Sequence, residues 1–281
     1  MLCVIGHPVA HSLSPRMHNA AISSLGLDLC YVAFDVAPEG VGSAIQGMRA
    51  LGILGMNVTV PHKQAVIPFL DELSDEARAV GAVNTIRNCG GKLSGFNTDV
   101  YGILTALRDT AGLDPLPARV AVLGASGAAR AVVYALASAR EVRCVTVFNR
   151  TVRKAEDLAR EMSAATGTPV AGRPLTIEAL REELPECGLL VNATSVGMHP
   201  DVEASPLPDP SVLHPDLVVY DAVFNPSETM LMRQAFSVGC RAYNGLDMLL
   251  HQGARSFEIW TGISAPVDVM REALYEASAG R

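Results

Sequence analysis

Short apolar runs rich in β-branched residues alternate along the chain with longer segments of helical periodicity. The runs predict strands over residues 2–6, 29–35, 55–60, 119–124, 144–149, 189–193 and 217–224. The segments between them predict helices over 15–25, 39–51, 128–138 and 229–238, and the tail over 246–260 and 267–277 is helical with no strand after it. This alternation is typical of strand-helix-strand units around a parallel sheet. The predicted fold class is α/β.

The chain length favours two domains. Its 281 residues approach twice the roughly 150 of an average domain. A turn-rich connection over residues 111–117 interrupts the pattern directly before a new apolar strand. The C-terminal helices lack a strand of their own, so we expect them to pack on another part of the chain, such as the first half.

Composition and charge exclude several classes of protein. With 49% hydrophobic and 18% charged residues, a packed globular protein is expected rather than a disordered one. The net charge of -7 provides no field for nucleic acid or an anionic membrane surface. There is no basic start, no secretory signal and no apolar run of about 18 residues, so we expect a cytoplasmic protein. The six scattered cysteines and the histidines share no metal-ligand spacing, and we expect no metal site.

The first candidate for chemistry is a small-residue turn after the apolar run 119–123. In a Rossmann unit this is where a dinucleotide pyrophosphate lies. Gly124 and Ala129 fit the glycine fingerprint, whereas Ser126 replaces its second glycine. The alternative is a tight strand-to-helix turn that binds no ligand.

The end of the next predicted strand bears on which dinucleotide is bound. An NAD-binding unit usually has Asp or Glu there for the ribose hydroxyls, but this chain has Asn149, Arg150 and Thr151, with Lys154 one helical turn later. A guanidinium pairs well with a 2′-phosphate, so the pattern favours NADP(H) over NAD(H). The alternative is a solvated helix start, although cations are disfavoured there unless an anion is near.

A polar strand face followed by a lysine is the second candidate. Strand alternation over residues 57–60 sends Asn57 and Thr59 to one face and the two valines to the other. Lys63 follows from a loop or helix start, and it is one of only three lysines among 22 basic residues. A retained lysine indicates a need for a compact, titratable donor. The alternative is an ordinary surface lysine.

Two further segments precede predicted helices. Asp99 is expected to lie beside an ammonium group and orient it. The alternative is that Thr98 or Asp99 serves only as the N-cap of the following helix. Ser12 and Ser14 lie just ahead of Pro15, which suits a first helical position. Free N–H groups at such a start bind a carboxylate. The alternative is that Ser14 is a plain N-cap.

Taken together, these segments resemble the shikimate dehydrogenase family along nearly the whole chain. Each motif is weak alone, but their order and spacing are specific. They are residues 5–8 (IGHP), 11–15 (HSLSP), 18–19 (HN), 57–63 (NVTVPHK), 81–85 (GAVNT), 95–99 (GFNTD), 124–128 (GASGA), 149–151 (NRT), 192–197 (NATSVG) and 244–249 (NGLDML), followed by Gln252.

The resemblance implies a reductase that converts 3-dehydroshikimate to shikimate with NADPH, on the route to aromatic amino acids. It implies a substrate domain over 1–103 plus 246–281, completed by the C-terminal helices, and a Rossmann-type NADP-binding domain over 104–245. Lys63 and Asp99 would be the catalytic pair. The implied substrate-binding residues are Ser12, Ser14, Asn57, Thr59, Asn84, Phe224 and Gln252. The implied cofactor-binding residues are Gly124, Ala125, Ser126, Gly127, Ala128, Asn149, Arg150, Thr151, Lys154, Thr194, Ala222 and Gly245.

Two departures from the family pattern qualify what it implies. Phe224 stands where the family often has Tyr, which removes a hydroxyl contact to the substrate carboxylate. Ser126 replaces a glycine of the phosphate loop, but it still offers an N–H and a hydroxyl. The alternatives are a paralogue acting on quinate or an aminoshikimate-like compound and, from another class, a non-catalytic dinucleotide-binding module. We expect a monomer or homodimer that binds neither nucleic acid nor membrane.

Overall fold

The computed structural model describes residues 1–279. The chain divides into two compact units, one made of Met1–Gly102 with Leu249–Arg281 and the other of Ile103–Met248. The second unit is therefore an insertion within the first. The unit boundaries therefore lie after residues 102 and 248, whereas the sequence led us to expect them after residues 103 and 245. None of the helices within residues 1–279 combines the length and apolar character needed to cross a membrane.

The first unit contains a six-stranded sheet in the order β2-β1-β3-β5-β6-β4. Its strands are β1 Leu2–Gly6, β2 Tyr31–Asp35, β3 Gly55–Val58, β4 Glu72–Leu73, β5 Thr85–Cys89 and β6 Lys92–Phe96. β1 pairs in parallel with β2 and β3, whereas β5 is antiparallel to both β3 and β6. This sheet is therefore mixed rather than purely parallel, because β5 and β6 form a hairpin that the apolar pattern did not reveal.

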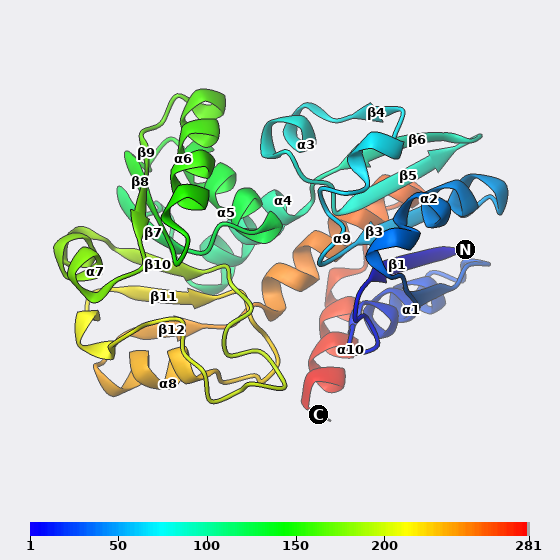
Figure 1. Ribbon diagram of the computed structural model, residues 1–281. Coiled ribbons are helices and arrows are strands. Elements are labelled where there is room, and N and C mark those ends of the chain that lie inside the picture. Colours follow the sequence, from blue (N-terminus) through cyan, green and yellow to red (C-terminus); the bar gives the residue numbers. More distant parts are fainter. Residues whose placement is uncertain (280–281) are drawn as a thin grey trace. The chain divides into compact units, whose positions relative to one another are not determined.

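The helices of the first unit lie on both faces of this sheet. They are α1 Ser14–Ser24, α2 Val41–Ala50, α3 Asp75–Val80, the start of α4 Asp99–Thr105, most of α9 Leu246–Thr261, and α10 Val267–Ala279, with short 3-10 turns η1 Pro38–Gly40 and η2 Ile67–Phe69. α2 and α3 share a buried apolar cluster with Ile5, Val58 and Ile86 of the sheet. On the other side α1 packs against α10 and contacts β1 and β2 (Figure 1).

β3 is shorter than its apolar pattern suggested. The strand ends at Val58, which is 2% exposed, whereas Val60 is 61% exposed. The predicted alternation therefore holds for Asn57 and Val58 but is wrong for Val60, since the backbone turns away after the strand. Residues 59–63 form the turn that carries Lys63.

The second unit contains a fully parallel sheet in the order β12-β11-β10-β7-β8-β9. Its strands are β7 Arg119–Leu123, β8 Cys144–Asn149, β9 Val170–Pro174, β10 Leu189–Asn192, β11 Val218–Asp221 and β12 Arg241–Tyr243. Counted from β7, the order is the 3-2-1-4-5-6 of a Rossmann domain, with the change of direction between β7 and β10. The predicted fold class, α/β with a Rossmann-type domain, is confirmed.

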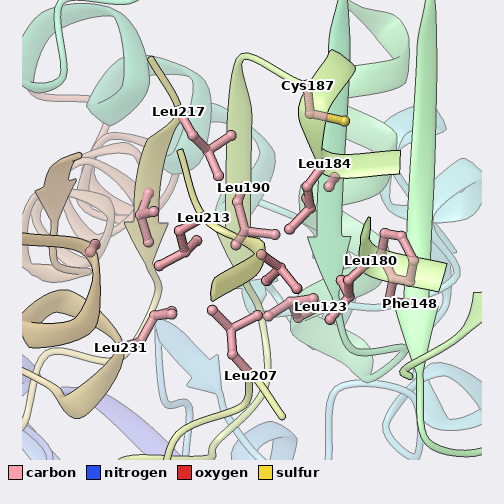
Figure 2. Packing of buried hydrophobic residues seen from close by; sticks show 14 of the residues in the cluster. Leu123, Phe148, Leu180, Leu184, Cys187, Leu190, Leu207, Leu213, Leu217 and Leu231 are labelled. Atoms are coloured by element: carbon pink, nitrogen blue, oxygen red, sulfur yellow. The ribbon is translucent and has the colours of Figure 1, made fainter. Parts of the chain in front are cut away.

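Helices cover the sheet of the second unit as well. They are α5 Gly127–Ser138, α6 Val152–Thr166, α7 Ile177–Glu183 and α8 Met230–Ser237, with the π-helix η3 Ala106–Thr110 and the short 3-10 turns η4 Leu184–Glu186 and η5 Pro210–Val212. α5 and α6 pack on β7, β8 and β9, and α8 packs on β11 and β12 (Figure 1). Figure 2 shows the core beneath α7 and α8, where Leu123 and Leu190 from the sheet meet Leu180, Leu184 and Leu231 from the helical segments.

Candidate active site

Lys63 and Asp99 form an ion pair in the first unit. Lys63 Nζ lies 2.6 Å from Asp99 Oδ2, and the two side chains are 13% and 7% exposed. Lys63 comes from the turn after β3, and Asp99 is the first residue of α4. Because both groups are largely removed from water, their charges act on a nearby group more strongly than a surface pair does.

Asn84 fixes the direction of the Asp99 carboxylate. Its Nδ2 donates to Asp99 Oδ1 at 2.9 Å and to Thr98 Oγ1 at 2.9 Å. Its Oδ1 accepts from the backbone N–H of Thr98 at 2.7 Å. A backbone donor on one side and a carboxylate on the other permit only one amide orientation. Asp99 is thus held on one oxygen by Asn84 while the other faces Lys63.

Gln252 and Asn57 extend this network. Gln252, on α9, accepts from Asn84 Nδ2 at 3.2 Å and donates to the carbonyl of Leu249 at 2.8 Å. Asn57 Nδ2 donates to the carbonyl of Asn84 at 3.1 Å, and Asn57 Oδ1 accepts from Tyr31 Oη at 2.7 Å. Strand β3, the turn after α3 and helix α9 therefore meet at one set of polar side chains.

Three buried hydroxyls complete the network beside Asn57. Ser256 Oγ lies 2.8 Å from Thr85 Oγ1, 3.0 Å from Thr98 Oγ1 and 3.1 Å from Asn57 Nδ2. Tyr31, Thr85 and Ser256 were not among the predicted site residues. The signal for Ser256 is its spacing of four from Gln252, which places both residues on one face of α9. Thr85 closes the 81–85 motif, which could have drawn attention to it, whereas Tyr31 resembles an ordinary strand residue.

The two serines expected to bind a carboxylate lie at the start of α1. Ser14 is the first residue of the helix, and Leu13 precedes it without a side-chain cap. The N-cap interpretation of Ser14 is therefore wrong. The backbone N–H of Ser14 donates to Ser12 Oγ at 3.3 Å, so the Ser12 hydroxyl satisfies one of the free donors of the helix start.

Two predicted substrate residues lie outside the network of Lys63. Thr59 is half-buried and packs on Gly6, where an added Cβ would lie 2.4 Å from the Thr59 methyl group. Gly6 is therefore required for the close approach of the two segments. Phe224 is half-buried in the second unit, three residues after β11.

Removing the Tyr31 hydroxyl tests whether the network is satisfied as described. Tyr31→Phe leaves Asn57 Oδ1 without its buried donor, so the free energy of unfolding is expected to fall by about 1–2 kcal/mol. Urea unfolding followed by circular dichroism measures the change. Tyr101→Phe is the matched control at an exposed position of α4, where the expected change is within about 0.5 kcal/mol. Equal effects of both substitutions would contradict the assigned hydrogen bond.

The small-residue turn of the second unit has the geometry of a dinucleotide loop. Gly124 follows β7 with φ +107, and an added Cβ would lie 2.8 Å from Thr194 Cγ2. Ser126 caps α5 by accepting from Ala129 N, and its hydroxyl donates to the carbonyl of Ala193 at 3.2 Å. Gly127 and Ala128 open the helix, so their N–H groups lie at its positive end. Only glycine lets this turn adopt its backbone conformation and approach Thr194 so closely, and the free N–H groups of the following helix start suit a pyrophosphate, so the loop fits the predicted group.

The start of α6 fits the phosphate of NADP(H). Thr151 is the capping residue, its side chain makes no capping bond, and the first turn contains no acidic residue. Arg150 and Lys154 are exposed beside it. Asn149 Nδ2 donates to the carbonyl of Thr151 at 3.0 Å, which fixes the segment that carries Arg150. Uncompensated cations at a helix N-terminus favour an anionic ligand.

The remaining predicted cofactor residues follow β10, β11 and β12. Thr194 donates its N–H and its hydroxyl to Asn192 Oδ1, at 3.0 and 2.7 Å. Gly245 N donates to the carbonyl of Val223 at 3.1 Å, and an added Cβ on Gly245 would lie 2.1 Å from the carbonyl oxygen of Ala222. Only glycine permits this approach. These segments lie at the carboxyl end of the parallel sheet, where Rossmann domains bind their ligands.

Across the described range, residues 1–279, no three or more His, Cys, Asp and Glu side chains gather in an arrangement suited to a metal ion.

Three family models match successive parts of the chain. The shikimate dehydrogenase substrate binding domain matches residues 4–86, and the shikimate/quinate 5-dehydrogenase model matches residues 111–202. The shikimate 5′-dehydrogenase C-terminal domain matches residues 245–275. The matched regions thus include α9 and several strands of each sheet.

Relatives that match over nearly the whole chain include shikimate dehydrogenases and a quinate dehydrogenase. The shikimate dehydrogenase (NADP+) of Methanopyrus kandleri is 48% identical over 97% of this chain and 94% of its own. The shikimate dehydrogenase structure from Thermus thermophilus, in complex with NADP(H) and shikimate, has a TM-score of 0.87 and 41% identity, covering 98% of each chain. The quinate dehydrogenase from Corynebacterium glutamicum, in complex with NAD, has a TM-score of 0.89 and 32% identity, again over 98% of each chain. The chain described here belongs to the shikimate dehydrogenase family.

Proposed function

We propose that this protein catalyses the reversible reduction of 3-dehydroshikimate to shikimate with NADP(H), a step of aromatic amino acid biosynthesis. The observation that carries the proposal is the pair of Lys63 and Asp99, 2.6 Å apart and largely withdrawn from water. Family membership and the NADP(+)-dependent relatives support the reaction and the cofactor. We assign substrate binding and catalysis to the first unit and the dinucleotide to the second.

Lys63 supplies the proton of the reduction. NADPH, when bound, supplies the hydride that reduces a ketone. The ketone oxygen gains negative charge as it is reduced, and the ammonium of Lys63 stabilises that charge and donates a proton to it. Asp99 balances the ammonium and orients it, while Asn84 keeps the Asp99 carboxylate from rotating. In shikimate oxidation, Lys63 takes the proton back.

The other polar residues bind and orient the substrate. Ser12 and Ser14 lie at the positive end of α1, which suits the substrate carboxylate. Amides and hydroxyls of the network suit ring hydroxyls, because each both donates and accepts. We assign these ring contacts to Asn57, Thr59, Asn84, Asp99 and Gln252.

The residues that would hold the dinucleotide lie at two helix starts and in the segments that follow β10, β11 and β12. The loop from Gly124 to Ala128 suits the pyrophosphate, and the segment from Asn149 to Thr151 with Lys154 suits the 2′-phosphate. Thr194, Ala222 and Gly245 complete the proposed set at the carboxyl end of the sheet.

A steady-state comparison of shikimate and quinate, each with NADP+ and NAD+, tests this function. We expect the highest kcat/KM for shikimate with NADP+. If neither shikimate nor quinate is turned over with either cofactor, the result would instead favour the non-catalytic dinucleotide-binding module.

A quinate or aminoshikimate dehydrogenase is the second candidate. The observation that favours it is Phe224, since the family often has a tyrosine hydroxyl there. The 32% identical quinate dehydrogenase shows that this fold also serves a quinate enzyme. A higher kcat/KM for quinate in the same comparison would favour this candidate.

Arg150 is expected to select the phosphorylated cofactor. Arg150→Ala removes a guanidinium from the start of α6, so the dissociation constant for NADPH should rise about tenfold or more, with little change for NADH. Fluorescence titration with each cofactor measures both constants. Arg160→Ala, on the same helix and paired with Asp157, is the control that should leave them unchanged. Equal losses for the two cofactors would refute the role of Arg150.

We also propose that the enzyme works in the cytoplasm. All six cysteines are free, and Cys30 and Cys89 are exposed, which suits a compartment that keeps thiols reduced. We expect a monomer or homodimer, and light scattering in solution distinguishes the two.

A further inference from the structure

A fully buried carboxylate lies at the end of β11 in the second unit. Asp221 is the last residue of that strand and is 0% exposed. Its Oδ1 accepts from Asn192 Nδ2 at 2.8 Å and from the backbone N–H of Val223 at 3.0 Å. Its Oδ2 accepts from Thr229 Oγ1 at 2.7 Å. None of the site residues described above uses this carboxylate directly.

The three donors require an acceptor at this position. Burial raises the pKa of Asp221 to about 6, although the bonds from Thr229, Val223 and Asn192 each lower it. At neutral pH the group is therefore mainly a carboxylate, which accepts on both oxygens and suits all three donors. A buried charge of this kind is costly, so it is retained where the hydrogen bonds it accepts serve a purpose.

One of these bonds leads to the loop over residues 193–197. Because Asn192 gives its amide N–H to Asp221, its Oδ1 must face the other way. That oxygen accepts both the N–H and the hydroxyl of Thr194. The Thr194 hydroxyl also accepts from Val196 N at 3.1 Å, which closes the turn of the loop. Thr194 thus depends on Asp221 through a single amide.

This loop lies against the dinucleotide turn. The Thr194 methyl group is the nearest atom to a Cβ built on Gly124, at 2.8 Å, and the carbonyl carbon of Ala193 follows at 3.3 Å. β7 and β10 are the strands between which the sheet changes direction, and ligands of open α/β sheets bind there. A shift of loop 193–197 would therefore change one wall of the dinucleotide site.

The other two bonds of Asp221 fix the segment over residues 222–224. Val223 N is held directly, and Val223 O accepts from Gly245 N. Thr229 caps α8 by accepting from Met232 N while giving its proton to Asp221. The carboxylate therefore ties together the chain that follows β10, the chain that follows β11 and the start of α8.

We propose that Asp221 is a positioning residue for the cofactor, acting through Asn192 on loop 193–197 and through Val223 on segment 222–224. The inference rests on the proposed function, because it takes NADP(H) to be the ligand of this edge of the sheet. Asp221 itself does not touch the cofactor. It keeps both segments in the arrangement that binds it.

Calorimetric titration with NADP+ tests the proposal without relying on turnover. Asp221→Ala removes all three acceptor contacts, and the dissociation constant for NADP+ is expected to rise at least about tenfold, since small displacements of a binding wall are costly. Asp221→Asn keeps the size of the side chain but places an N–H against one of the donors. It is expected to show a smaller rise in the same direction, and it carries the test if the alanine variant does not fold.

Two further variants separate positioning from general stability. Leu213→Ala opens the core shown in Figure 2, so it should lower Tm while leaving the dissociation constant unchanged. Asn192→Ala should raise the dissociation constant for NADP+, as Asp221→Ala does. Because the two side chains act in series, the dissociation constant of the double variant should lie within about threefold of that of the weaker-binding single variant. Hydrogen exchange of loop 193–197 should rise in the Asp221 variants and not in Leu213→Ala.

Binding of NADP+ to both Asp221 variants within about twofold of the wild type would overturn the inference while leaving the proposed function intact. Additive losses in the double variant would overturn the route through Asn192. A wild-type protein that does not bind NADP+ would overturn both this inference and the proposed function.

Discussion

Replacing Lys63 with alanine is expected to reduce kcat for shikimate oxidation by at least about a hundredfold, the lower range for losing a positioned proton donor. The variant loses both the charge that stabilises the developing alkoxide and the proton that it takes up. Its KM for NADP+ should stay near the wild-type value, because Lys63 belongs to the first unit and the dinucleotide loop to the second. Steady-state kinetics in both directions measure these constants.

The chain offers a matched control for that variant. Lys92 also pairs with a carboxylate at 2.6 Å, but its side chain is 59% exposed and its partner is Glu72 on the surface. Lys92→Ala removes the same kind of group from a solvated pair, so kcat should be unchanged. A Lys63→Ala variant with near-normal kcat would refute the assigned proton donor.

Acid is expected to destabilise the protein through His18. Its ring is fully buried, stacks on Tyr31 with centroids 4.3 Å apart, and has no hydrogen-bond partner among residues 1–279 for either ring nitrogen. Burial lowers the pKa of His18 to about 3 from its ordinary value of 6.5. The folded protein therefore keeps this ring neutral at pH values where the unfolded chain protonates it.

The sign and size of the effect follow from linkage. Below about pH 6.5 the unfolded state binds the extra proton, so the free energy of unfolding falls as the pH drops toward 3. The full loss is on the order of 5 kcal/mol, since each pKa unit corresponds to about 1.4 kcal/mol. Carboxyl groups whose pKa is lowered in the folded state, such as Asp71 beside Arg49, also make the protein less stable as the pH falls. Their contribution must be subtracted from the measured pH dependence to leave that of His18.

Comparison with His18→Phe isolates this contribution. The variant keeps an aromatic ring against Tyr31 but has no titratable group, so its stability should depend less steeply on pH between 7 and 4. Urea unfolding of both proteins across this range gives the difference. His199→Phe replaces an exposed histidine and should leave the pH dependence as it is in the wild type. Parallel curves for the wild type and His18→Phe would rule out a neutral buried ring.

The sequence predicted the second unit better than the first. β7, β8, β10 and β11 lie in the middle of a parallel sheet, so each is mainly apolar along its length. β9 and β12 lie at its edges, and their polar positions, such as Arg173 and Arg241, hide them from an apolar pattern. In the first unit the hairpin of β5 and β6 was missed, although Gly90 and Gly91 between them are a hairpin signal.

The site was predictable where its residues are close in sequence or match a family motif. Lys63, Asp99, Asn84 and Gln252 were expected, and they do form one hydrogen-bonded group. Ser256 was not, because its contacts depend on the packing of α9. It bonds to Asn57 at a separation of 199 residues, and no local pattern specifies such a pairing.

The insertion of one unit within the other fixes the order in which the protein can be completed on the ribosome. The second unit has its whole sequence once residue 248 is made, whereas the first, although it begins the chain, still lacks α9 and α10. Trp260 donates to the carbonyl of Ile86 and lies where a Cβ on Gly55 would be, so its ring fills the space beside β3. Nascent chains that already contain Lys63 and Asp99 therefore still lack Gln252 and Ser256, and the hydrogen-bonded network around Asn84 and Asn57 is completed only after α9 has been made.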